Sequence, residues 1–131
     1  MKKIGILNKD ISEVIASMGH MDMLVVCDAG LPIPPGVRRI DLALKEGLPG
    51  FIETVETVNK ELQVDQIIFA EETGKISPQI EEQLLKLFSG CKTERVPHQK
   101  LKELTRLAVA VIRTGEFTPY ANVILVSGVV F

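Results

Sequence analysis

The chain has 131 residues, of which 46 % are hydrophobic and 24 % charged, and it contains no tryptophan. This length suits a single domain over residues 1–131, and the composition excludes a disordered chain while slightly favouring subunit interfaces. The net charge is only −2, and lysine and arginine form no basic stripe, which argues against a nucleic-acid partner.

The cysteines and the apolar runs are informative about the cellular location of the protein. Cys27 and Cys91 form no paired metal-ligand motif and favour reduced thiols, as in the cytoplasm. The apolar start of the chain is interrupted from Asn8 onward, which argues against an export signal, and the run 107–112 is too short to cross a membrane. We therefore expect a cytoplasmic protein with no membrane contact.

The first half of the chain predicts one helix and two strands. Asn8 or Asp10 can cap a helix whose apolar side chains recur at helical spacing, and Gly19 suits a left-handed residue after its last turn. Residues 23–27 predict a strand that is apolar on both faces, as in a sheet covered by helices on each side. A stiff loop with three prolines and two glycines follows, and residues 37–42 predict a second short strand.

The second half continues to alternate between helical and extended patterns. Ser77-Pro78 is a strong helix start, with serine at the cap and proline at the first helical position, and Gly115 stops the last helix. In chain order, the expected elements are helix 51–62, strand 66–70, helix 77–90, strand 91–96, helix 99–113 and strand 122–127.

Strands that alternate with helices indicate an α/β fold. We expect a three-layer α/β/α, Rossmann-like domain with a mostly parallel (mixed) sheet of about six strands. In such sheets, ligands bind outside the carboxyl ends of the strands. Asp28 follows the strand 23–27 and is therefore a candidate ligand-binding residue, although it could equally cap the following turn with its own side chain.

The only two histidines, His20 and His98, stand where the chain passes from one element to the next. Histidine titrates near neutral pH, so this placement suggests proton transfer on a small substrate, with capping or surface duty as the alternative. The sole tyrosine, Tyr120, lies two residues before Asn122, so both side chains share one face if the last strand has begun there. A phenol and an amide on one face suit hydroxyl recognition, but a half-buried tyrosine and a strand-initiating asparagine explain them equally well.

The sequence carries no cofactor motif. The residues after Cys27 lack the glycine spacing of a phosphate-binding loop. The acidic pairs Glu71-Glu72 and Glu81-Glu82 lack further ligands at metal spacing and are better explained as solvated surface. Cys27 is best explained as a small buried hydrophobe, because no basic residue adjoins it. We expect a protein that needs no metal and no organic cofactor.

Several of these segments together resemble the D-ribose pyranase and L-fucose mutarotase family, most closely its ribose branch. The matching stretches cover the chain from end to end and are Gly19-His20 with Asp22, Asp28-Ala29-Gly30-Leu31-Pro32-Ile33-Pro34, Gly36-Val37, Ile40-Asp41-Leu42-Ala43-Leu44, Val96-Pro97-His98 and Thr118-Pro119-Tyr120-Ala121-Asn122-Val123-Ile124-Leu125.

The resemblance implies an intramolecular isomerase that interconverts the pyranose and furanose forms of D-ribose. By motif it implies His20 as the proton donor and Asp28, His98, Tyr120 and Asn122 as sugar-binding residues. It also implies a cytoplasmic homo-oligomer, a decamer of two pentameric rings. The alternatives are a mutarotase for another monosaccharide such as fucose, a non-catalytic sugar-binding module, a metal-dependent isomerase and a purely structural ring protein.

The implied reaction agrees with the residues available. Opening one sugar ring and closing another requires only proton transfers and positioning, for which general acid/base catalysis suffices. The apolar tail Gly128–Phe131 would leave an exposed patch on a monomer, so we expect it to be docked, near a neighbouring subunit.

Overall fold

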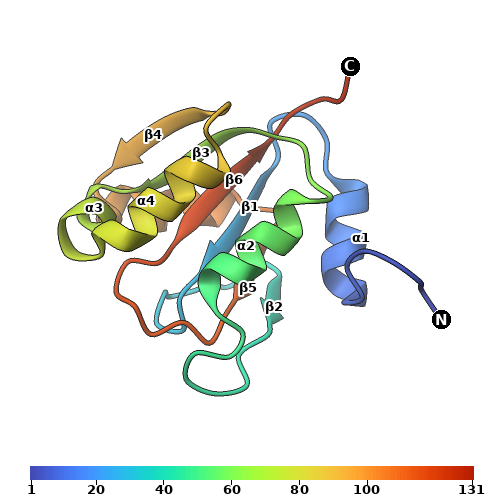
Figure 1. The fold of residues 1–131 in the computed structure, drawn as a ribbon, viewed down its shortest axis with the longest axis horizontal. Helices are drawn as coiled ribbons and strands as arrows, with labels where there is room; N and C mark the ends of the chain where they lie inside the picture. Colours follow the sequence, from blue (N-terminus) through green and yellow to red (C-terminus); the bar gives the residue numbers. More distant parts are fainter.

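The computed structural model describes all residues 1–131 and is built on a six-stranded sheet in the order β2-β5-β1-β6-β3-β4 (Figure 1). The pairs β2–β5, β5–β1 and β3–β4 are parallel, whereas β6 is antiparallel to both β1 and β3. Five strands therefore run in one direction and β6 alone runs against them. The strands are β1 Met23–Cys27, β2 Arg39–Asp41, β3 Val64–Ala70, β4 Lys92–Val96, β5 Ala110–Arg113 and β6 Val123–Ser127.

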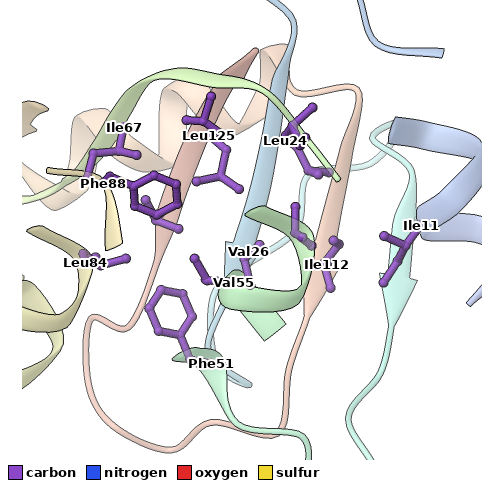
Figure 2. Close-up of a cluster of buried hydrophobic side chains, with 14 of the residues drawn as sticks. Ile11, Leu24, Val26, Phe51, Val55, Ile67, Leu84, Phe88, Ile112 and Leu125 are labelled. Carbon is purple, nitrogen blue, oxygen red and sulfur yellow. The ribbon is translucent and has the colours of Figure 1, made fainter. Parts of the chain in front are cut away.

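Helices cover both faces of the sheet, as the three-layer prediction requires. Figure 1 shows α1, α2 and α4 on one face, and Figure 2 shows side chains of these helices meeting those of the strands in a single apolar cluster. On the other face, Leu101 of α5 packs with Val25, Val111 and Ile124. The helices are α1 Lys9–Ser17, α2 Phe51–Asn59, α3 Glu71–Ile76, α4 Pro78–Leu87 and α5 His98–Leu104, followed by the 3₁₀ turn η1 Thr105–Leu107.

The central strand β1 is buried on both faces, as its apolar run predicts. Leu24 and Val26 belong to the cluster under α1, α2 and α4, and Val25 and Cys27 to the cluster under α5. All four side chains are fully buried. Alternate residues of a strand point to opposite faces, so a strand apolar throughout fits only between two covering layers.

The prediction of one helix over 99–113 is wrong in its second half. The helix α5 ends at Leu104, and Ala110–Arg113 forms β5 between β1 and β2. Residues Ala110, Val111 and Ile112 are fully buried. A strand buried on both faces lacks the alternation of polar and apolar residues, so periodicity alone does not distinguish it from a helix.

Two further local predictions differ from the structure. Asn8 caps α1 as expected, its side chain accepting a hydrogen bond from the Ile11 amide at 3.0 Å. The left-handed residue after this helix is Met21, with φ 70°, and not Gly19. Ser77 precedes α4 as expected, but its hydroxyl makes no capping bond with that helix. No helix is long and apolar enough to traverse a lipid bilayer.

Candidate active site

Four of the five predicted site residues lie together at one edge of the sheet. Because β6 runs against the other strands, the segments after β1 and β4 meet the segment before β6 at this edge. These segments carry Asp28, His98, Tyr120 and Asn122, which together line a cavity of about 570 Å³. A cavity of this size, with a few converging polar groups, is typical of a site for a small molecule.

Asp28 and Asn122 hold each other in place. The Asp28 amide donates to Asn122 Oδ1 at 3.0 Å, and Asn122 Nδ2 donates to Asp28 Oδ2 at 2.9 Å. The Gly30 amide donates to Asp28 Oδ1 at 2.9 Å, so Asp28 both caps its own turn and lines the cavity. Burial raises the pKa of Asp28, against the opposing effect of these hydrogen bonds. The remaining lone pairs of this carboxylate and one N–H of the amide are free for a ligand.

His98 and Tyr120 form an edge-to-face aromatic pair, with ring centroids 5.0 Å apart and planes at 88°. Burial, reinforced by the charge of Lys102, lowers the pKa of His98. Its Nδ1 is buried without a hydrogen-bond partner, and a protonated Nδ1 would need one. The premise that Tyr120 lies in the last strand is wrong, because β6 begins at Val123 and Tyr120 has a left-handed φ of 61°.

Arg113, at the end of β5, ties three segments together at the cavity. Its Nη1 lies 3.1 Å from each carboxylate oxygen of Asp41, and its Nε donates to the Ala29 carbonyl at 3.1 Å. The clamp fixes the backbone next to Asp28. The sequence reasoning missed Arg113 because β5 was predicted as helix. Assigning the strand correctly would have placed this residue at a carboxyl end, where ligand-binding residues gather.

Glu116 also lines the cavity and was not predicted. Its carboxylate accepts hydrogen bonds from the Phe51 amide at 3.0 Å and from the Thr118 hydroxyl at 2.8 Å. Partial burial by itself would raise the pKa of Glu116, but these bonds outweigh it and lower that pKa. Phe51 is 65 positions away in the chain, so no local pattern could have indicated this contact.

The structure bears on the alternatives considered for other polar residues. Cys27 is a buried hydrophobe as predicted, because burial and the neighbouring Asp28 charge raise the pKa of its thiol to about 12. The prediction of purely solvated acidic pairs is wrong for Glu72. That carboxylate is half-buried and accepts a hydrogen bond from the His98 amide at 3.0 Å.

His20 is not part of this cavity within one chain. It lies in the exposed turn before β1, whereas Asp28 follows the same strand. A five-residue strand at about 3.3 Å per residue puts the two roughly 16 Å or more apart, at opposite edges of the sheet. The Met21 amide next to His20 donates to the Ser127 carbonyl at 2.9 Å, so the turn lies beside the carboxyl end of β6.

Residues 1–130 match the model of the RbsD / FucU transport protein family. The chain belongs to this family. It is 56 % identical to the D-ribose pyranase of Chloroflexus aggregans and 55 % identical to that of Laribacter hongkongensis, in both cases over the whole length of both chains. The resemblance to ribose pyranases in the sequence is thereby confirmed.

Solved structures of the family share this fold. Bacillus subtilis RbsD, solved in complex with D-ribose, is 48 % identical and superposes with a TM-score of 0.98 over the full length of both chains. A fucose mutarotase of Streptococcus pneumoniae is 23 % identical over 95 % of each chain and has a TM-score of 0.81, which shows the common fold alone. These matches confirm the predicted α/β class with a six-stranded mixed sheet.

Proposed function

We propose that this chain is a D-ribose pyranase, an intramolecular isomerase that interconverts the pyranose and furanose forms of D-ribose without a cofactor. The observation that carries the proposal is the convergence of Asp28, His98, Tyr120 and Asn122 on one cavity. The relatives that this chain matches over their full length support the choice of ribose, since two are named D-ribose pyranase and a third was solved with D-ribose.

The reaction needs one proton removed from the anomeric hydroxyl and one delivered to the ring oxygen. The anomeric C–O bond then becomes a carbonyl, the open chain rotates, and another hydroxyl closes the new ring. Asp28 and Asn122 are suited to hold sugar hydroxyls by accepting and donating hydrogen bonds. Neutral His98 adds a further polar contact, and the Tyr120 ring offers a flat surface against the sugar. A general acid/base contribution of about 10² to 10⁴ is enough for a reaction that ribose already undergoes in water.

We further propose that His20 is the proton donor and that it enters the cavity of a neighbouring copy. His20 and the cavity lie at opposite edges of the sheet, so such a contact joins two different surfaces. Contacts of this heterologous kind build closed rings when the rotation between copies closes. The apolar side chain next to His20 supports a subunit contact there, because Met21 is 63 % exposed.

The family resemblance favours a homodecamer of two pentameric rings, and we propose that assembly, with residues 1–131 acting as one sugar pyranase domain. The tail that we expected to be docked is exposed in the single chain, with Val130 85 % exposed, so a neighbour would have to cover it. The two cysteines are free, which supports a reducing compartment, and we place the protein in the cytoplasm.

Saturation-transfer NMR on D-ribose tests the function, because it measures exchange between pyranose and furanose directly. The protein should accelerate this exchange, and treatment with a strong chelator should leave the rate unchanged. His20→Ala should lower the rate by roughly 10² or more while ribose affinity stays close to that of the unmodified protein.

Three results would contradict these assignments. No acceleration by the folded protein would exclude a pyranase and leave a sugar-binding module. Faster exchange of L-fucose than of D-ribose would favour a mutarotase for another sugar. Near-normal exchange in folded His20→Ala would exclude His20 as the proton donor.

A further inference from the structure

The backbone of Tyr120 is held in a conformation that tyrosine rarely adopts. Its φ of 61° lies in the left-handed region, where a side chain other than that of glycine, asparagine or aspartate is uncommon. Such a conformation persists only where the surroundings impose it, and it is found mostly at functional sites. Contacts with neighbouring residues must therefore hold Tyr120 in this left-handed conformation.

Two buried hydroxyl groups bind the backbone at this point. Thr73 Oγ1 donates to the Tyr120 carbonyl at 2.9 Å, and Ser77 Oγ donates to the Pro119 carbonyl at 2.6 Å. Thr73 is fully buried and Ser77 is 1 % exposed, so water does not compete for either bond. Ser77 makes no side-chain capping bond to α4, and its hydroxyl is committed to the loop instead.

The short helix α3, which carries Thr73, also holds the aromatic partner of Tyr120. Glu72, one residue before Thr73 in α3, accepts a hydrogen bond from the His98 amide at 3.0 Å. His98 and Tyr120 lie 26 and 47 positions from their respective partners in α3. The helix α3 and Ser77 thus join the start of α5 to the loop before β6, which are the two segments that carry the aromatic pair.

We propose that Thr73, with Ser77 and Glu72, is a positioning residue that holds the His98–Tyr120 pair in the geometry that receives the sugar. The expected effect on ribose binding depends on the proposed function. The structural part of the proposal, that the Thr73 hydroxyl holds Tyr120 in place, depends only on contacts within the single chain.

The proposal predicts a specific defect when the Thr73 hydroxyl is removed. Thr73→Val keeps the shape of the side chain but removes one of the two hydrogen bonds to the Tyr120 carbonyl. Only the bond from the Asn122 amide at 2.9 Å then remains, so the loop relaxes away from the left-handed conformation. The Tyr120 ring then shifts against His98. Because the proton donor His20 is not involved, the defect should fall on sugar binding and not on the proton-transfer step.

Tyr120 can be followed alone, because the chain has one tyrosine and no tryptophan. The near-ultraviolet circular dichroism and the fluorescence of the sugar-free protein therefore report on this ring. Thr105→Val is the matched control, since Thr105 is equally buried and its hydroxyl donates to the Leu101 carbonyl at 2.9 Å, outside the cavity. Thr73→Ser restores the hydroxyl and serves as the rescue.

Thr73→Val should change the tyrosine spectra and raise the KM for ribose by roughly tenfold, with kcat within about twofold, since a misplacement of about 1 Å can cost a hundredfold. Thr105→Val and Thr73→Ser should keep spectra and KM close to those of the unmodified protein. Ser77→Ala should change the spectra in the same direction as Thr73→Val. This variant tests the positioning role if Thr73→Val does not fold.

Unchanged tyrosine spectra in the folded Thr73→Val and Ser77→Ala variants would overturn the proposal, as would an equal rise of KM in Thr105→Val. If the unmodified protein shows no ribose exchange at all, the proposed function is refuted. The tyrosine spectra of the variants would then test the positioning role by themselves.

Discussion

His98 is surrounded by groups with opposing effects on its protonation. Burial and the charge of Lys102 disfavour the imidazolium ion, whereas Glu72 and Asp28 favour it, and the first two dominate, so the pKa is lowered. The buried Nδ1 without a partner acts in the same direction, because an N–H at this position would have no acceptor. His98 is therefore a neutral imidazole at neutral pH, which suits the proposed role of binding sugar and leaves the proposed proton transfer to His20.

This environment predicts how ribose affinity responds to pH. A free histidine becomes half-charged near pH 6.5, and the lowered pKa leaves less than half of His98 charged at that pH. Affinity measured by calorimetry should thus fall as His98 becomes charged, with a midpoint below about pH 6.5. The His20→Ala background removes the only other histidine from the titration. A midpoint at or above about pH 6.5 in that background would contradict the assignment.

At the scale of elements, β5 and the turn after it form the rigid support of the cavity. Arg113 ends the strand, and its Nη1 contacts both carboxylate oxygens of Asp41. Two positions later, the Gly115 amide donates to the Pro49 carbonyl at 2.9 Å, and the Gly115 carbonyl accepts from the Gly47 amide at 2.7 Å. The chain thus packs backbone against backbone beside the site, which leaves no room for a side chain at Gly115.

Gly115→Ala should therefore destabilise the protein. The added Cβ would lie 2.5 Å from the Leu48 carbonyl oxygen, and closer still to that of Lys45. We expect a loss of about 1 to 3 kcal/mol, the cost of overpacking a filled space. Urea unfolding at fixed protein concentration measures it. Gly90→Ala is the control, because a Cβ there meets nothing within 4 Å. Equal midpoints for the two variants would show that the turn relaxes freely.

At the scale of the whole molecule, the proposed catalytic residue and the proposed sugar-binding residues occupy opposite edges of one sheet. His20 precedes β1 and Asp28 follows it, so no rearrangement short of unfolding β1 brings them together in one chain. An active site that uses both must combine two copies. Activity should then depend on assembly, and a dissociated monomer should exchange ribose slowly.

Co-expression of two inactive variants tests this arrangement. His20→Ala retains an intact cavity, and Asp28→Asn retains His20, the proposed proton donor. In mixed rings, about a quarter of the sites should pair the cavity of the first with the His20 of the second, because a heterologous contact joins different surfaces of neighbouring copies. Exchange activity should recover to about that fraction of the unmodified protein.

Each variant expressed alone provides the control and should stay inactive. Failure of the mixed rings to recover activity, with both variants shown by mass to be in the same assembly, would show that His20 does not complete the site of a neighbouring copy. A fully active monomer in sedimentation would exclude the shared site altogether.

The sequence by itself determined the strand β1, the capped helix α1, the alternation that defines the α/β class, and the motifs that identify the family. These features depend on neighbouring residues, whose periodicity and turn chemistry are visible locally. The candidate sugar-binding residues were also predictable, because Asp28 follows a strand and the others fall in matching motifs.

Only the tertiary structure decided what depends on contacts between distant segments. It showed that β5 is a strand, which the sequence could not indicate because burial on both faces removes the polar–apolar alternation. It also showed that β6 is the one antiparallel strand, and this direction brings Asn122 to the edge of the sheet where Asp28 lies. It also showed that Ser77 serves the loop of Tyr120 and not its own helix. Hydrogen-bond partners such as these, tens of residues apart, are chosen by packing, which no local pattern records.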